Sequence, residues 1–358
     1  MTSARWIVSP GWDAACIWGP VWAAGLLALV VPAGAEVGTW SWLALVLGID
    51  VAHVWSTLFR TYLDADWRRA RPGLAWGAPA VAAVGTVSLS WAAPAWFWTG
   101  MAWLAVFHFI RQPIGFAALY RLVGGWPSRD REARIERAAL VAVTVGPIVW
   151  WHAHLPRPFV WFADGDFWPA LPPIVGTVAL AAAAVTLLGW AVARVWGGRS
   201  NPGGDLWVVG TAVAWGGGIV WGRSDLAFTL SNVVAHGLPY VALVGVAARR
   251  SAVRRGRGPG LALVGAGWGL LVALPWTLAF LEEAAWDLLV SHEHPSLFGE
   301  ADGLTGGPLR VAVGLLAVPQ VTHYLLDGWI WRFPPGGENR AWALDRGGAD
   351  PPAGSVTG

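Results

Sequence analysis

The chain of 358 residues has no lysine, one cysteine and few charged side chains of any kind. Only 13% of its residues are charged, against about 25% in an average soluble domain, and 56% are hydrophobic. Cys16 lies inside an apolar run, so a disulfide framework and a cysteine metal site are both excluded. This composition excludes an ordinary soluble domain. It predicts an integral membrane protein with the lipid bilayer as partner and no nucleic-acid partner.

Several motifs that carry chemistry are also missing. There is no Walker A loop, no Rossmann glycine fingerprint, no G-x-S-x-G elbow and no H-E-x-x-H zinc motif. The paired histidine boxes of membrane desaturases and hydroxylases are absent too. The classes of enzyme that depend on these motifs are therefore not expected.

Apolar runs long enough to span a bilayer recur along the chain, since a spanning helix needs about 20 mostly apolar residues. They predict an all-α fold, a polytopic transmembrane helical bundle of about ten spanning helices in a single domain over residues 1–332. The tail 333–358 is predicted to be disordered and cytoplasmic. The predicted helices cover residues 14–34, 38–64, 73–93, 96–122, 138–156, 172–196, 206–222, 226–248, 260–281 and 309–332.

The arginines predict the orientation of these helices, because positive charge in short loops stays cytoplasmic. They concentrate in the connections 65–72, 123–137, 197–205 and 249–259, whereas the opposite side carries only Arg157, Arg223 and Arg310. Both termini are therefore expected to be cytoplasmic. All basic residues are arginine, and Gly, Pro and Ala are abundant. This suggests a GC-rich bacterial genome, and hence a bacterial cytoplasmic (inner) membrane.

The second, fourth, eighth and tenth predicted helices all run from the outer side to the cytoplasm, and each carries one histidine. These are His53, His108, His236 and His323, about 10–15 residues from the outer helix end. At a rise of about 1.5 Å per residue the four rings fall at a similar depth. Polar groups at that depth are costly and usually face the interior of a bundle.

Other polar residues accompany the four histidines. On the second helix Asp50, His53, Thr57, Arg60 and Asp64 follow one another at steps of three and four residues, which places them on one face. The candidate partners on the other three helices are Arg111, Asn232, Tyr240, Gln320, Tyr324 and Asp327.

Three interpretations of this pattern remain open. Imidazoles suit iron, zinc or copper, and four ligands from four helices is how bundles build metal sites. Non-haem iron is the favoured ion, with zinc as an alternative. Asp50, Asn232, Gln320 and Asp327 would then be ligands or hold the rings. In the second interpretation the histidines ligate haem and Arg60 and Arg111 pair with its propionates. In the third they form a metal-free polar network.

A second group of histidines is predicted on the outer side. His152 and His154 end the fifth helix, and His292 and His294 lie in the predicted loop 282–308. If the two pairs meet, they form a second metal site for zinc or copper.

The plan of four single histidines from separate helices is similar to that of the bacterial membrane carotene-cleaving oxygenases. The resemblance implies four histidines around one iron. It concerns the plan alone, because the segments Asp50-Val-Ala-His53, His236-Gly-Leu-Pro239 and Thr322-His323-Tyr324 do not reproduce the motifs of that family.

Three functions follow as hypotheses. The first is a membrane metalloenzyme, an iron-dependent oxidoreductase or oxygenase that acts on a hydrophobic lipid or isoprenoid substrate. In it Tyr240 and Tyr324 donate protons or electrons, and Arg60 and Arg111 position a polar end of the substrate. The second is a transporter or channel that uses the His/Asp/Arg stripe as a proton or solute path. The third is a haem-binding redox or assembly protein.

Overall fold

The computed structural model describes residues 6–168, 171–197, 201–258, 260–265, 267–335 and 337–344. All regular secondary structure in these ranges is helical, which confirms the all-α prediction. Seven helical stretches are long and apolar enough to cross a membrane, judged by length and composition, so the fold is that of a multi-pass membrane protein. They are α3–η2 (Thr39–Arg60), α6 (Pro72–Ala92), α7 (Pro94–Val123), α9 (Pro173–Gly197), α11 (Asp225–Arg255), α13–η4 (Gly269–Ser291) and α15–α16 (Gly306–Ile330).

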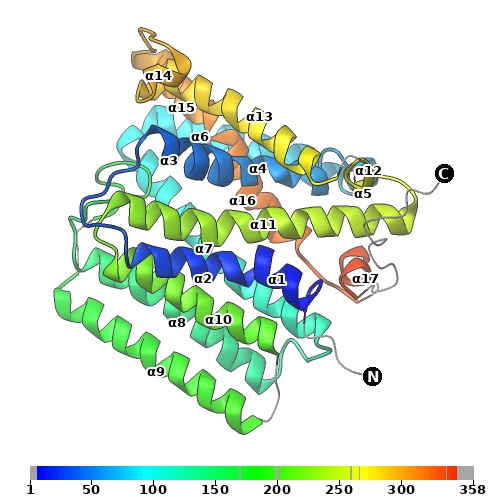
Figure 1. The fold of residues 1–358 in the computed structure, drawn as a ribbon. Coiled ribbons are helices and arrows are strands. Elements are labelled where there is room, and N and C mark those ends of the chain that lie inside the picture. The colour runs from blue at the N-terminus through cyan, green and yellow to red at the C-terminus, as the bar shows by residue number, and fades with distance from the viewer. Residues whose placement is uncertain are drawn as a thin grey trace.

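The other three predicted spans are helical but fall outside that set. The first is divided into α1 (Pro10–Cys16) and α2 (Trp18–Ala28). Pro20 explains the break, because a proline ring clashes with the carbonyl four residues earlier. The others are α8 (Arg131–His152) and α10 (Pro202–Trp215) with η3 (Gly216–Trp221). In Figure 1 α2, α8 and α10 lie between α11 and α9. The structure therefore supports seven spans, and ten remains a prediction.

Several predicted boundaries differ from the structure. Helix α8 begins at Arg131 and not at residue 138, and α11 continues to Arg255 and does not end at residue 248. The predicted helix 260–281 is divided into α12 (Gly260–Gly265) and α13 (Gly269–Trp286), and it continues through η4 (Asp287–Ser291). Glu282, Glu283 and Asp287 therefore lie on a helix, not in a loop. The outer connection after it contains the short helix α14 (Pro295–Phe298).

The predicted disordered tail also contains ordered residues. Helix α17 (Glu338–Leu344) falls inside the range 333–358, and the side chain of Trp342 is completely buried. It packs in the core cluster that contains Trp207 and Tyr120. Order therefore extends to residue 344, and residues 345–358 lie outside the described ranges.

Helix α11 runs through the middle of the bundle, and α9 and α13 lie at opposite edges (Figure 1). Burial agrees with this order, since 72% of the most apolar part of α11 is buried, against 17% for α9 and for α13–η4. One glycine allows α11 to approach the second predicted helix closely. A Cβ on Gly237 would lie 2.5 Å from Cγ2 of Ile49, which is a steric clash. Only glycine therefore fits at this position without a shift.

The second predicted helix is not a regular α-helix. It consists of α3 (Thr39–Ser41), a π-helix η1 (Trp42–Val51), α4 (Ala52–Ser56) and a 3₁₀ turn η2 (Thr57–Arg60). Such departures from α-helical winding occur often at functional sites. Here the transition from π to α winding falls between Asp50 and His53, so it sets the direction in which both side chains leave the helix.

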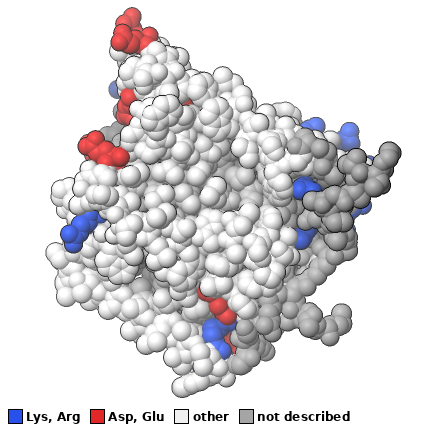
Figure 2. Space-filling model, in the orientation of Figure 1, with Lys and Arg blue, Asp and Glu red and all other residues white. Residues whose placement is uncertain are grey.

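Charge is distributed unevenly over the face shown in Figure 2. Acidic groups gather at one end, around the outer loops near α14, and basic groups gather mostly at the other end. Figure 1 shows α1, α5 (Ala65–Ala70), α17 and the end of α11 at the basic end. The arginine-rich connections therefore lie at one end of the bundle, and the cytoplasmic placement of that end stays a prediction.

Candidate metal centre

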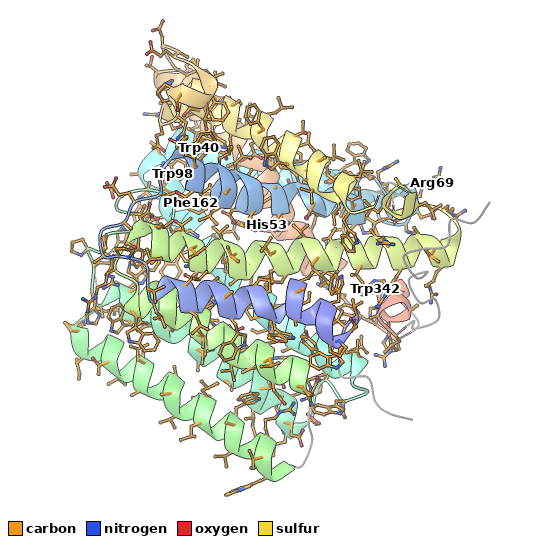
Figure 3. The ribbon with its side chains drawn as sticks, viewed as in Figure 1. Trp40, His53, Arg69, Trp98, Phe162 and Trp342 are labelled. Atoms are coloured by element: carbon orange, nitrogen blue, oxygen red, sulfur yellow. The ribbon has the colours of Figure 1, made fainter. Side chains whose placement is uncertain are left out.

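The four histidines come from four helical segments that run in the same direction across the bundle. His53 lies on α4, His108 on α7, His236 on α11 and His323 on α16 (Val318–Ile330). Each is at most 6% exposed. Figure 3 shows His53 near the middle of the bundle, between Trp98 at one end and Arg69 at the other. The predicted meeting of the four helices at one depth is confirmed.

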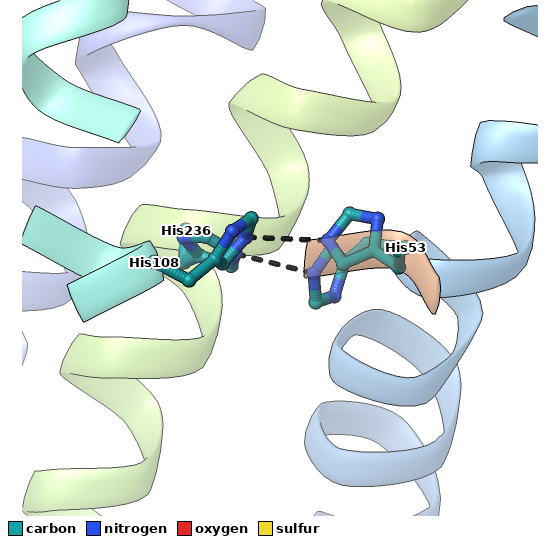
Figure 4. A group of neighbouring side chains, drawn as sticks. His53, His108 and His236 are labelled. Carbon is teal, nitrogen blue, oxygen red and sulfur yellow. Dashed lines mark hydrogen bonds between the residues drawn. The ribbon is translucent and has the colours of Figure 1, made fainter. Parts of the chain in front are cut away.

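The four rings converge on one point. One nitrogen from each histidine lies within 4.8 Å of all the others. Nε2 of His236 lies 3.1 Å from Nε2 of His53, and Nε2 of His323 lies 3.2 Å from Nε2 of His108. Figure 4 shows these rings facing one another across the gap between the helices. In the described part of the chain this is the one group of histidine, cysteine or carboxylate side chains arranged to hold a metal ion.

These distances match those around a coordinated ion. Histidine nitrogens bind zinc at about 2.0–2.1 Å, so neighbouring ligands lie about 2.8–3.0 Å apart in octahedral geometry and about 3.3–3.4 Å apart in tetrahedral geometry. The two separations of 3.1 and 3.2 Å fall between these values. The site consists of nitrogen donors alone, which suits iron, zinc, copper or nickel better than magnesium or calcium.

A chain of hydrogen bonds connects His323 to a carboxylate. The hydroxyl of Tyr240 donates to Oδ1 of Asp327 at 2.6 Å, and it lies 2.9 Å from Oγ1 of Thr57. Oγ1 of Thr57 lies 2.8 Å from Nδ1 of His323. Because the only proton of the tyrosine hydroxyl goes to Asp327, Thr57 must donate to Tyr240 and accept from Nδ1–H of His323. This assignment leaves the Nε2 lone pair of His323 directed at the other histidines.

Asp327 lies close to a second ring as well. Its Oδ2 is 3.7 Å from Nε2 of His108, and its Oδ1 is 3.8 Å from Nδ1 of His323. Asp50, on the second helix, is 3.5 Å from Nδ1 of His53. Both aspartates predicted to accompany the histidines therefore adjoin them, beyond the distance of a direct hydrogen bond.

Asn232 and Gln320 take different positions. Asn232 lines a small cavity of about 20 Å³ together with His236 and Gln112. Its side-chain amide donates to the carbonyl of Phe228 at 3.0 Å. Gln320 donates to the hydroxyl of Tyr324 at 2.5 Å, and the ring of Tyr324 lies against that of His108 with centroids 4.5 Å apart. Gln320 therefore contacts the site through Tyr324.

The two arginines predicted at the site separate. Arg60 is 7% exposed and its guanidinium lies 5.7 Å from the ring centroid of Trp331, which in turn packs against Tyr240. Arg111 is exposed, and its guanidinium lies 5.9 Å from the ring of Phe107, itself 61% exposed. Arg60 thus adjoins the site on its basic side, and Arg111 faces outward from α7.

Some contacts of the site were not anticipated. The ring of Phe109 stacks on that of His236, with centroids 3.8 Å apart, and Gln112 donates to the carbonyl of His236 at 2.8 Å. Thr57 appeared in the polar stripe, but its role as the link between His323 and Tyr240 did not. Its spacing of four residues from His53 was the available signal.

The second histidine group does not assemble. Nδ1 of His152 and of His154 each bond to a carbonyl of their own helix, those of Ile148 and Trp150. His294 lies instead against Trp42, with centroids 3.9 Å apart. The second metal site, which the sequence left open, is therefore not formed by the described residues.

No protein-family model, curated protein or solved structure matches this chain. The site must therefore be interpreted from its own chemistry.

Proposed function

We propose that this protein is a membrane-embedded, iron-dependent oxidoreductase or oxygenase in which His53, His108, His236 and His323 hold one iron ion. The observation that carries the proposal is the convergence of four buried imidazole nitrogens within 4.8 Å. The hydrogen-bonded chain from His323 to Asp327 supports it, since metal-bound histidines usually donate their other nitrogen to a fixed acceptor. When bound, the ion would supply redox chemistry with dioxygen as the oxidant.

Iron is favoured over zinc by the surroundings of the cluster. Here the walls are aromatic, with Phe109 and Tyr324 lying against two of the rings. An apolar wall suits the oxidation of a hydrophobic lipid or isoprenoid that enters laterally from the bilayer. Tyr240 and Tyr324 are the candidate proton or electron donors, and Arg60 would face a polar end of the substrate.

Haem is less well supported than a single ion. Two histidines that ligate one haem iron stand on opposite faces of a wide macrocycle. In this cluster all four nitrogens surround one point, with two pairs at 3.1 and 3.2 Å. The spacing favours a single ion over a porphyrin.

A proton path is the second candidate function. The same separations fit neutral imidazoles that share N–H···N hydrogen bonds, and His323, Thr57, Tyr240 and Asp327 form a continuous chain of exchangeable protons. In that case the protein would be a proton-linked transporter in the bacterial inner membrane, without a metal.

Metal analysis of the purified full-length protein distinguishes the two functions. We expect about one iron per chain by mass spectrometry and no Soret band in the visible spectrum. His53→Ala and His323→Ala should each lose the iron. His152→Ala is the matched control, because His152 is also buried but bonds to its own helix, and it should keep the iron.

The proposal fails if the unaltered protein contains no metal, or if the two cluster variants retain as much iron as the control. Size-exclusion profiles and thermal unfolding of each variant separate loss of metal from loss of the fold. Stoichiometric zinc in place of iron would contradict the redox function while leaving the metal site intact.

A further inference from the structure

A second, larger cavity opens at the basic end of the bundle. It has a volume of about 530 Å³, within the range of about 300–1,000 Å³ typical of small-molecule sites. The second helix, α5, α11 and the end of α16 meet around it. Its lining residues include six arginines and two aspartates: Arg60, Arg69, Arg71, Arg255, Arg257, Arg332, Asp64 and Asp66.

The two carboxylates are engaged by three of these arginines. Asp64 pairs with Arg255 at 2.7 Å, and Asp66 pairs with Arg255 at 3.2 Å, with Arg257 at 2.9 Å and with Arg69 at 4.0 Å. The described lining nevertheless carries four more guanidinium groups than carboxylates. So large an excess in one cavity attracts an anion, and guanidinium groups bind phosphate in bidentate fashion.

The cavity also has an apolar side. Trp67, Ile330 and Pro334 line it beside the arginines. Arg60, the most deeply placed of the arginines, lies under two indole rings, 5.7 Å from Trp331 and 6.0 Å from Trp342. A ligand that fills the cavity therefore meets guanidinium groups together with aromatic and aliphatic side chains.

The anion could be a free phosphate or the headgroup of a phospholipid, and the position of the cavity in the fold favours the phospholipid. The cavity lies where Arg60 ends a candidate membrane span and Ile330 ends another. Where a spanning helix ends, we expect lipid headgroups. Basic pockets between helices at this depth bind anionic lipids. We propose that this cavity binds the phosphate group of an anionic phospholipid from the leaflet at the arginine-rich end. The proposal does not depend on the metal centre.

The test measures binding of a fluorescent phosphatidylglycerol to the full-length protein in detergent micelles. We expect saturable binding that an excess of unlabelled phosphatidylglycerol abolishes and phosphatidylcholine does not. Inorganic phosphate and pyrophosphate are added as separate competitors. Weak competition by them supports a lipid, whereas competition as strong as that of the phospholipid overturns the lipid source.

Two variants localise the binding. Arg71→Gln lies at an exposed edge of the cavity and Arg60→Gln at its buried end, and each should weaken binding about tenfold, the size expected for one charge-assisted contact. Arg60→Lys keeps the charge but loses the planar fork. Its affinity for the phospholipid should therefore lie between that of the unaltered protein and that of Arg60→Gln.

Arg134→Gln is the matched control. It removes an exposed arginine from the start of α8, at a position outside the cavity lining. Equal loss of binding in this control, or equal affinity for phosphatidylcholine, would overturn the proposal. The iron content of the Arg71→Gln variant should be unchanged, so a failure of this site is distinguishable from a failure of the metal centre.

Discussion

At the scale of single residues, Thr57 connects the histidine cluster to its surroundings. It accepts from His323 and donates to Tyr240, which donates to Asp327, so its hydroxyl accepts the Nδ1–H hydrogen bond that holds His323 in this tautomer. Thr57→Val keeps the shape but removes this bond. We expect metal affinity to fall about 10–100-fold, the usual effect of losing such a partner.

Competition with a chelator measures this loss of affinity. Thr61→Val is the control, because the Thr61 hydroxyl is buried but donates only to the carbonyl of Thr57 in its own helix. If both valine variants release the metal at the same chelator concentration, the hydroxyl of Thr57 does not hold His323 in the way described.

Asp64 combines two roles at the arginine-rich end of the second helix. Its carboxylate accepts from the backbone N–H groups of Asp66 and Trp67 as the N-cap of α5, and it pairs with Arg255. Burial alone would raise its pKa. The hydrogen bond and charge of Arg255 and the two backbone donors outweigh burial, so the pKa of Asp64 lies below its ordinary value of 3.8.

The sign of the resulting pH dependence follows from this shift. A carboxylate with a lowered folded-state pKa contributes stability that is complete above the unfolded value of 3.8 and is lost as pH falls through the lower folded value. Asp64→Asn should remove this contribution but keep the cap. The Tm of this variant should therefore fall less between neutral and acid pH than that of the unaltered protein. Asp64→Ala should cost about 1 kcal/mol more, because it also removes the cap. Thermal unfolding from about pH 7 to about pH 3 tests both. Identical Tm values for the two variants at neutral pH would contradict the capping role.

At the scale of helices, the approach of α11 to the second helix brings His236 to His53. Gly237 permits it, since an added Cβ would meet Cγ2 of Ile49 at 2.5 Å and its carbonyl oxygen at 3.2 Å. Gly237→Ala should push the helices apart, lower the Tm and release the metal. Overpacking of this kind typically costs about 1–3 kcal/mol.

The control for this prediction is a glycine in another histidine helix. Gly115→Ala on α7 adds the same methyl group where no atom lies within 4 Å, so Tm and metal content should be unchanged. Combining Gly237→Ala with Ile49→Ala removes the clashing methyl group and should recover part of the lost Tm. Absence of any recovery would show that the contact with Ile49 is not the cause.

The sequence was sufficient to locate the four histidine helices but not all of their neighbours. Apolar length and arginine-rich connections determine where such helices begin and end, and the histidines follow from the shared direction of the helices. The predicted helix that corresponds to α13 ended too early, because the carboxylates that follow residue 281 were interpreted as part of a loop. Glu282 accepts from the indole of Trp55 at 2.6 Å, so an acid that appeared to mark a loop is accommodated on a helix by a distant residue. The stacking of Phe109 on His236 likewise depends on tertiary contacts that no local pattern encodes.

At the scale of the whole molecule, the uneven charge makes the site directional. The acidic connection around α14 lies at one end (Figures 1 and 2), and the arginine-lined cavity and α5 lie at the other. If the basic end is cytoplasmic, Arg60 and the lipid cavity face the cytoplasm, while Asp50 lies on the outer side of His53. Orientation therefore decides from which compartment polar ligands reach the cluster.

Cysteine labelling tests this orientation. With Cys16→Ser as background, Ser296→Cys on α14 and Arg134→Cys on α8 place one exposed thiol at each end of the bundle. Because positive charge stays cytoplasmic, a membrane-impermeant maleimide added to intact bacterial cells should label Ser296→Cys and leave Arg134→Cys unlabelled until the cells are broken. Labelling of Arg134→Cys in intact cells would place the arginine-rich end outside. It would also move the proposed phospholipid from the cytoplasmic to the outer leaflet.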